Sequence, residues 1–225
     1  MTVEWPEILK PTRITDPYLA GSYTSGGRTS SGLEQRVYSD AGYWRLSYSI
    51  PIRNRAQVLA WRAMAGRLAA GEDMLVRVYD MHRTDGALGD VQEARVAADA
   101  AIGSTTIQIE ASNLDIEIGA HLTIGARLYR VMIIAAKTPS LSTPDRLSSD
   151  LPWDDSAVWL EEPLDAPTLW TLVVLPPVRD DLTTGMVADF RYLALLTVPE
   201  DPSSLQLDLD VGKFADPTLA LVEAI

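Results

Sequence analysis

The chain has 225 residues, of which 47% are hydrophobic and 22% are charged, a composition typical of a folded globular protein and not of a disordered chain. It contains no cysteine and two histidines, His82 and His121. Disulfide scaffolds, zinc fingers and thiol nucleophiles are therefore excluded, and imidazole chemistry has almost no residues to use. We expect both histidines at the surface, and a protein that is not an enzyme and needs no cofactor or metal.

The formal net charge of −12 is unevenly distributed along the sequence. Residues 1–86 contain eleven Lys and Arg against nine Asp and Glu, whereas residues 87–225 contain eight against 22. An acidic surface repels phosphate backbones and anionic lipid headgroups. The sequence therefore predicts no specific nucleic-acid binding and no membrane insertion. Because no long apolar span or N-terminal signal pattern is present, it also predicts synthesis in the cytoplasm.

Residues 1–35 are predicted to form an extended N-terminal arm and loop. Seven Pro and Gly residues interrupt this stretch, together with polar runs of Ser and Thr, and both features disfavour a packed helix. An extended arm requires a surface to lie on. A neighbouring subunit is one candidate for that surface.

A discontinuous main β domain is predicted over residues 33–88 and 169–225. The clearest strand signal is the stretch 43–52, where apolar and polar side chains alternate with a period of two, as in a half-buried antiparallel strand. The apolar face of this stretch consists of Trp44, Leu46, Tyr48 and Ile50. Further strands of this domain are predicted at 74–81, 169–175, 187–198 and 205–211, and residues 217–225 as a docked terminal segment.

One amphipathic helix is predicted over about residues 55–70. Asn54 has the side chain of an N-cap, and Gly71 provides a C-terminal stop. An apolar stripe that includes Trp61 follows helical spacing, so the helix should pack on the sheet. We expect Trp61 to contact Trp44 there.

A small β-module is predicted as an insert over residues 90–137. Its short apolar runs, separated by Gly and Asn, predict four strands near 107–109, 116–118, 122–124 and 128–134. Residues 138–168 contain seven acidic residues against the single Arg146, and this composition indicates a long exposed loop rich in Pro and Ser. The predicted fold class is mainly β: a split β-barrel or sandwich with one packed α-helix and a small inserted β-module.

The motifs that could support catalysis are weak. Gly21 and Gly26 have the spacing of a phosphate-binding loop, but Gly27 stands where that loop needs a lysine. Acidic pairs occur at 154–155 and 161–162, and paired carboxylates serve glycosidases and calcium sites. No glycine-punctuated calcium loop accompanies them, so solvated surface charge explains them better.

Aromatic residues are the most distinctive feature of the composition, with six Trp and eight Tyr. Trp5, Trp153 and Trp159 fall in the predicted arm or loop, where an exposed indole is unfavourable unless something covers it. Because Trp is enriched at the energetic centres of protein interfaces, these three are candidates for contacts with another chain.

Several short segments, spread over most of the chain, resemble structural proteins at the distal end of long-tailed (siphovirus-type) bacteriophage and prophage tails. The matching segments are 5–6, 24–27, 32–35, 103–107, 124–131 and 175–179. On this resemblance Pro6 and Arg179 join the three tryptophans as interface candidates.

The resemblance implies a distal tail protein of the virion. Such a protein has a split β-barrel with a helix and assembles into a homo-oligomeric ring, with a hexamer as one option. The ring connects the tail tube protein to the baseplate hub protein and leaves a passage for DNA, which an acidic lumen would not adsorb. The inserted module would project outward and dock peripheral proteins.

Two other functions compete with this one. The first is a carbohydrate- or receptor-binding module of the tail tip, in which Trp153 or Trp159 stacks on sugar rings. The second is a hydrolase that uses acids such as Asp154 and Glu161, which the weak motifs place last.

Overall fold

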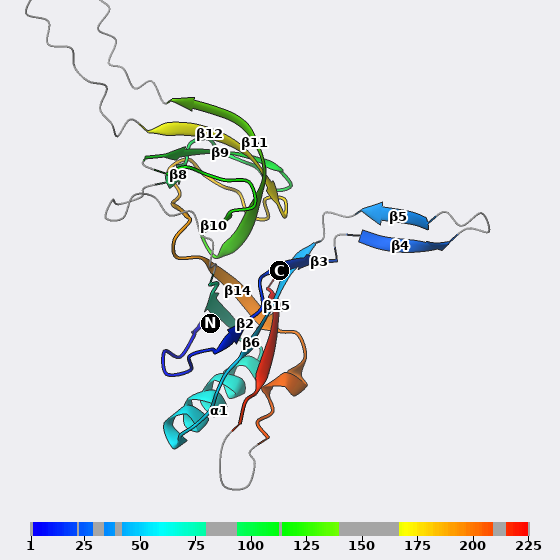
Figure 1. The fold of residues 1–225 in the computed structure, drawn as a ribbon, viewed down its shortest axis with the longest axis vertical. Helices are drawn as coiled ribbons and strands as arrows, with labels where there is room; N and C mark the ends of the chain where they lie inside the picture. Colours follow the sequence, from blue (N-terminus) through cyan, green and yellow to red (C-terminus); the bar gives the residue numbers. More distant parts are fainter. Residues whose placement is uncertain are drawn as a thin grey trace, which may run out of the picture.

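The fold is taken from a computed structural model that describes residues 2–21, 23–28, 34–38, 42–79, 94–112, 114–139, 167–208 and 215–224. This part of the chain is mainly β with one α-helix, which confirms the predicted fold class. It consists of two β bodies and a separate hairpin (Figure 1). We call the larger body the main sheet and the smaller one the barrel. Within the described residues no helix is long and apolar enough to cross a membrane.

The main sheet has seven strands in the order β1-β7-β14-β15-β6-β2, with β3 also pairing with β6. Its strands are β1 (Thr2–Glu4), β2 (Arg13–Ile14), β3 (Tyr18–Ala20), β6 (Tyr43–Ser49), β7 (Asp73–Arg77), β14 (Ala194–Pro199) and β15 (Thr218–Glu223). All neighbours are antiparallel except β1 and β7, which run parallel. Strand β6 alternates buried and half-buried residues, as its sequence pattern predicts.

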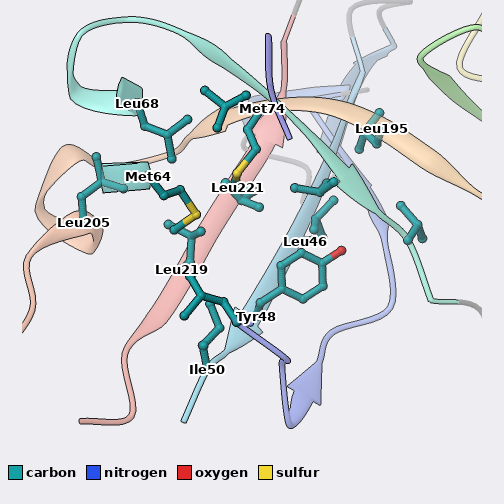
Figure 2. Packing of buried hydrophobic residues seen from close by; sticks show 14 of the residues in the cluster. Leu46, Tyr48, Ile50, Met64, Leu68, Met74, Leu195, Leu205, Leu219 and Leu221 are labelled. Atoms are coloured by element: carbon teal, nitrogen blue, oxygen red, sulfur yellow. The ribbon is translucent and has the colours of Figure 1, made fainter. Parts of the chain in front are cut away.

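Helix α1 (Arg55–Ala69) packs against the main sheet with the boundaries that the sequence predicts. The Asn54 side chain accepts a hydrogen bond from the Gln57 backbone N–H at 2.9 Å, and Gly71 has a φ of 87° just after the helix. The buried side chains of the helix are Trp61, Met64 and Leu68. Figure 2 shows Met64 and Leu68 against leucines of β15. The helix and the sheet thus share one apolar core.

The barrel contains six strands in the order β13-β10-β11-β12-β9-β8. They are β8 (Ala94–Val96), β9 (Thr106–Ala111), β10 (His121–Ile124), β11 (Arg127–Pro139), β12 (Thr168–Leu175) and β13 (Ala188–Asp189). A bridge between Arg95 and Val187 brings the first and last strands together, so the sheet is nearly closed. It encloses a core of its own, separate from the core of the main sheet.

The domain boundaries predicted for the inserted module are wrong. Strand β12 pairs with β9 and β11, and β13 pairs with β10, so residues 168–189 belong to the barrel and not to the main domain. The module therefore extends well past residue 137. The alternating pattern of β12 predicts a strand correctly but does not say which sheet it joins, because its partners in β9 lie between 57 (Thr168↔Ala111) and 67 (Val173↔Thr106) residues away in sequence.

Three smaller predictions for this half of the chain also differ from the structure. No strand forms at 116–118, although Ile116 is buried. No strand forms at 205–208: Leu205 ends the 3₁₀ helix η1 (Pro202–Leu205), and 206–208 are irregular, while residues 209–214 lie outside the described part. Residues 218–223 form β15, which lies inside the main sheet between β14 and β6.

The predicted N-terminal arm is also wrong for most of its length. Strands β1, β2 and β3 all join the main sheet, and Val3 and Leu9 are buried in its core. The chain itself therefore provides the surface that the arm lies on. Strands β4 (Tyr23–Arg28) and β5 (Glu34–Tyr38) pair only with each other, and Figure 1 shows this hairpin extending away from both bodies.

Strands occupy both ends of the segment 138–168, which the sequence predicts to be an acidic loop. Strand β11 runs to Pro139 and β12 begins at Thr168. Residues 140–166, with Trp153 and Trp159, lie outside the described residues, so these two interface predictions stay predictions.

Candidate functional site

The projecting hairpin is the first candidate site. Its strands are held by pairs such as Tyr23↔Tyr38 and Thr24↔Val37, and within the described chain no other strand pairs with either of them. At its base, Ala20 of β3 pairs with Tyr43 of β6. A two-stranded hairpin alone is marginally stable in water, and its unpaired edges are templates for another strand. The hairpin is therefore suited to lie against a second surface.

The junction between the barrel and the main sheet is the second candidate. At its centre lies Glu223, at the end of β15, whose residue surface is only 3% exposed. Its Oε2 accepts a hydrogen bond from the Trp44 backbone N–H at 3.2 Å. Its Oε1 lies 3.5 Å from Nη1 of Arg127 and 3.6 Å from Nε of Arg179. One buried carboxylate thus faces two guanidinium groups.

Both arginines also bind other groups across the junction. The Nε of Arg127 donates to the Asp180 carboxylate at 2.9 Å, and its Nη1 donates to the Ala224 carbonyl. Nη2 of Arg179 donates to the Gly42 carbonyl beside β6. Arg127 and Arg179 come from the barrel half of the chain, whereas their backbone acceptors directly flank β6 and β15 of the main sheet. These bonds therefore fasten one body to the other.

Burial dominates the electrostatics of the junction. Loss of solvent raises the pKa of Glu223, while the Trp44 N–H and the two arginines oppose this shift. Burial likewise raises the pKa of Tyr129, a barrel residue that is 1% exposed. A buried charge held by partners from both bodies favours one relative arrangement, because separating the bodies would leave it unpaired.

Trp44 forms a second part of the junction. Its indole Nε1 donates to the Leu128 carbonyl of β11 at 2.6 Å. The Arg130 guanidinium lies 5.1 Å from the indole centroid, and Nε of Arg130 donates to Nε2 of His121 at 2.9 Å. His121 is 6% exposed, so the expected surface position is wrong for this residue. Strands β6, β10 and β11 are thereby joined through side chains.

Three of the predicted interface residues have partners within the chain. Nε1 of Trp5 donates to the Leu9 carbonyl at 2.7 Å, and its ring packs edge-on against Tyr48 at 5.2 Å. The Pro6 carbonyl accepts the Leu9 N–H at 2.9 Å. Arg179 lies in the junction. Trp5 is half-buried against the core of its own sheet, and its contact with another chain stays a prediction.

The sequence prediction missed Glu223 and Arg127. The sequence did contain an indication for Glu223. It is the one charged residue after Pro217, and on a strand it lies on the same face as Leu219 and Leu221. A carboxylate at an inward position of a strand is seldom buried without partners. Arg127 had no comparable signal, because its partner lies 96 positions away in sequence.

No family model and no curated protein matches this sequence. Within the part of the chain that the structure describes, no group of three or more His, Asp or Glu side chains could hold a metal ion.

Proposed function

We propose that this chain is a structural component of a phage tail tip, whose copies form a ring that connects the tail tube to the baseplate hub. The proposal combines the resemblance of its short segments to distal tail proteins with the projecting hairpin. It places the protein in the virion and assigns it no enzymatic reaction. Its partners are further copies of itself, the tube protein and the hub protein.

The observation that carries the proposal is the hairpin of β4 and β5. It pairs only with itself in the described chain and extends away from both bodies (Figure 1). Two strands without a covering layer gain little stability alone, whereas backbone pairing with a neighbouring copy would satisfy their edges. A contact from the hairpin of one copy to a different surface of the next is heterologous, and such contacts form a ring when the rotation between copies closes.

The junction supports the same role. The barrel is tied to the main sheet by a buried carboxylate, two arginines and Trp44, so it would have a fixed orientation on a ring built from the main sheets. A fixed outer barrel offers a repeated docking surface, and repetition around a ring multiplies modest affinities. The acidic excess of the chain would keep a passing genome from adsorbing.

The decisive variant is a deletion of residues 22–41. It joins Gly21 to Gly42 and leaves Ala20 and Tyr43, which already pair, connected by a two-residue Gly-Gly turn of the kind that hairpins favour. The two bodies should keep their fold, because the deleted hairpin contributes no strand to either sheet. We expect unchanged circular dichroism and thermal unfolding, and loss of multimers in size-exclusion chromatography with light scattering.

A matched control keeps the hairpin length but replaces residues 23–28 and 34–38 by alternating Thr and Ser. If backbone pairing provides the contact, this control should retain part of the assembly that the deletion abolishes. Electron microscopy of the parent particle then tests the location, with density expected at the tip between tube and hub. A deletion variant that assembles like the full chain would remove the observation on which the proposal rests.

A further inference from the structure

A cluster of exposed tyrosines and arginines lies where the chain passes from the barrel into β14. Tyr192 is 55% exposed and Tyr79 is 45% exposed. The guanidinium carbon of Arg77 lies 5.2 Å from the ring centroid of Tyr192 and 5.5 Å from that of Tyr79. The guanidinium carbon of Arg191 lies 5.4 Å from the Tyr192 centroid. Two cations thus share one exposed phenol ring.

These two cations have no carboxylate partner among the described residues. The ion pairs of the described residues involve other arginines and Lys137, and neither Arg77 nor Arg191 takes part in any of them. Among the described residues no ion pair uses their N–H groups, and a planar guanidinium is a geometrically selective donor to an anion.

A hollow of about 340 Å³ adjoins this cluster. Tyr192 forms part of its wall, and the other lining residues are Thr123, Gly125, Met186, Val187, Asp189 and Ala194. The lining is therefore of mixed chemistry, with a carboxylate, a hydroxyl and apolar side chains. A ligand that fits it must carry hydroxyl donors for the carboxylate as well as an apolar surface.

The loop that carries the cluster is held in place by hydrogen bonds. Oδ1 of Asp189 accepts the backbone N–H groups of Arg191 at 2.8 Å and Tyr192 at 2.7 Å. Two residues later, the Ala194 N–H donates to Oγ1 of Thr123 at 2.9 Å. A site on such a loop loses little conformational entropy when a ligand binds.

From this arrangement we infer that the hollow and its Tyr–Arg rim bind a sugar that carries an anionic group, a carboxylate or a phosphate. The anionic group would lie against Arg77 and Arg191, and the hydroxyl-bearing ring would enter the hollow beside Asp189. The Asp189 carboxylate disfavours a bare anion inside the hollow, since like charges repel. The sugar body is therefore required, and this activity goes beyond the proposed structural role.

Titration calorimetry on the purified full chain tests the site with defined probes. The positive probes are a galacturonate tetramer and glucose 1-phosphate, which distinguish a carboxylate from a phosphate source. The negative probes are maltotetraose, inorganic phosphate and a tetraglutamate peptide. We expect saturable binding of at least one positive probe and binding of the three negative probes at least ten-fold weaker.

Variants connect the binding to the cluster. The double substitution Arg77→Gln and Arg191→Gln should weaken binding by about ten-fold or more, the size expected when charge-assisted hydrogen bonds are lost. Arg191→Gln alone, on a surface turn, serves as a second variant if the double variant folds poorly. Arg62→Gln is the matched control, since Arg62 is an exposed arginine of α1, and its binding should be unchanged.

The inference would be overturned if neither anionic sugar bound. It would also be overturned if phosphate, tetraglutamate or maltotetraose bound as tightly as the anionic sugars. A third contradicting result is unchanged binding of the sugars by both Arg191→Gln and the double variant. The test does not depend on assembly. The chain that lacks residues 22–41 should bind the sugar like the full chain, so failure of the ring proposal and failure of this one give different results.

Discussion

Truncation of Trp61 to Ala should destabilise the main sheet strongly. Its side chain is fully buried between α1 and the sheet, and its Nε1 donates to the Leu205 carbonyl at 3.1 Å. Removing a buried large aromatic costs about 3–5 kcal/mol through lost burial and the cavity left behind. The Leu205 carbonyl also loses its donor, which moves the expected value toward the upper end of this range.

The free energy of unfolding can be measured by urea denaturation followed by circular dichroism, and the midpoint by calorimetry. For a chain of this size, the loss corresponds to a midpoint lower by roughly 6–20 °C. The matched control is Leu59→Ala on the same helix, because Leu59 is 51% exposed and its truncation should change stability by about 0.5 kcal/mol or less. A Trp61→Ala variant within about 1 kcal/mol of the wild type would refute the packing of α1 described above.

Two further predictions concern the junction. Because burial raises the pKa of Glu223 above its ordinary value of 4.5, the folded chain binds this proton more readily than the unfolded chain. The stability that this carboxyl contributes is fully present below pH 4.5 and is lost as the pH rises through the raised pKa. The variant Glu223→Gln should therefore lose this part of the pH dependence when the free energy of unfolding is measured over a series of pH values. A pH profile identical to that of the wild type would contradict the prediction. Trp44→Phe removes the donor to the Leu128 carbonyl and should lower the free energy of unfolding by about 1–3 kcal/mol. Amide hydrogen exchange in β10 and β11 should become faster. Unchanged exchange there would show that Trp44 does not join the two bodies.

Local patterns predicted the local structure well. The alternation in 43–49 identified β6, and the Asn54 cap with the Gly71 stop identified α1 almost to the residue. Both signals depend on side chains that act within one or two turns or along one strand. The general class, mainly β with one helix, follows from the same patterns.

The predicted contact between Trp44 and Trp61 shows the limit of such patterns. Both residues are on buried faces, as predicted, but Trp44 contacts His121 and Arg130 in the junction, whereas Trp61 binds the Leu205 carbonyl. The period of a strand or helix tells which side is buried. It does not tell which end of the sheet a second body will cover.

The sequence by itself determined the β6 strand, the α1 helix and the existence of most barrel strands, because these depend on residues close together in the chain. Only the tertiary structure decided that β12 belongs to the barrel, that β1–β3 join the main sheet and that Glu223 is buried between two arginines. Those outcomes depend on pairings between distant segments, chosen by how well whole edges and faces fit. A period-two pattern is compatible with many such partners, so it leaves the choice among them to the folded chain.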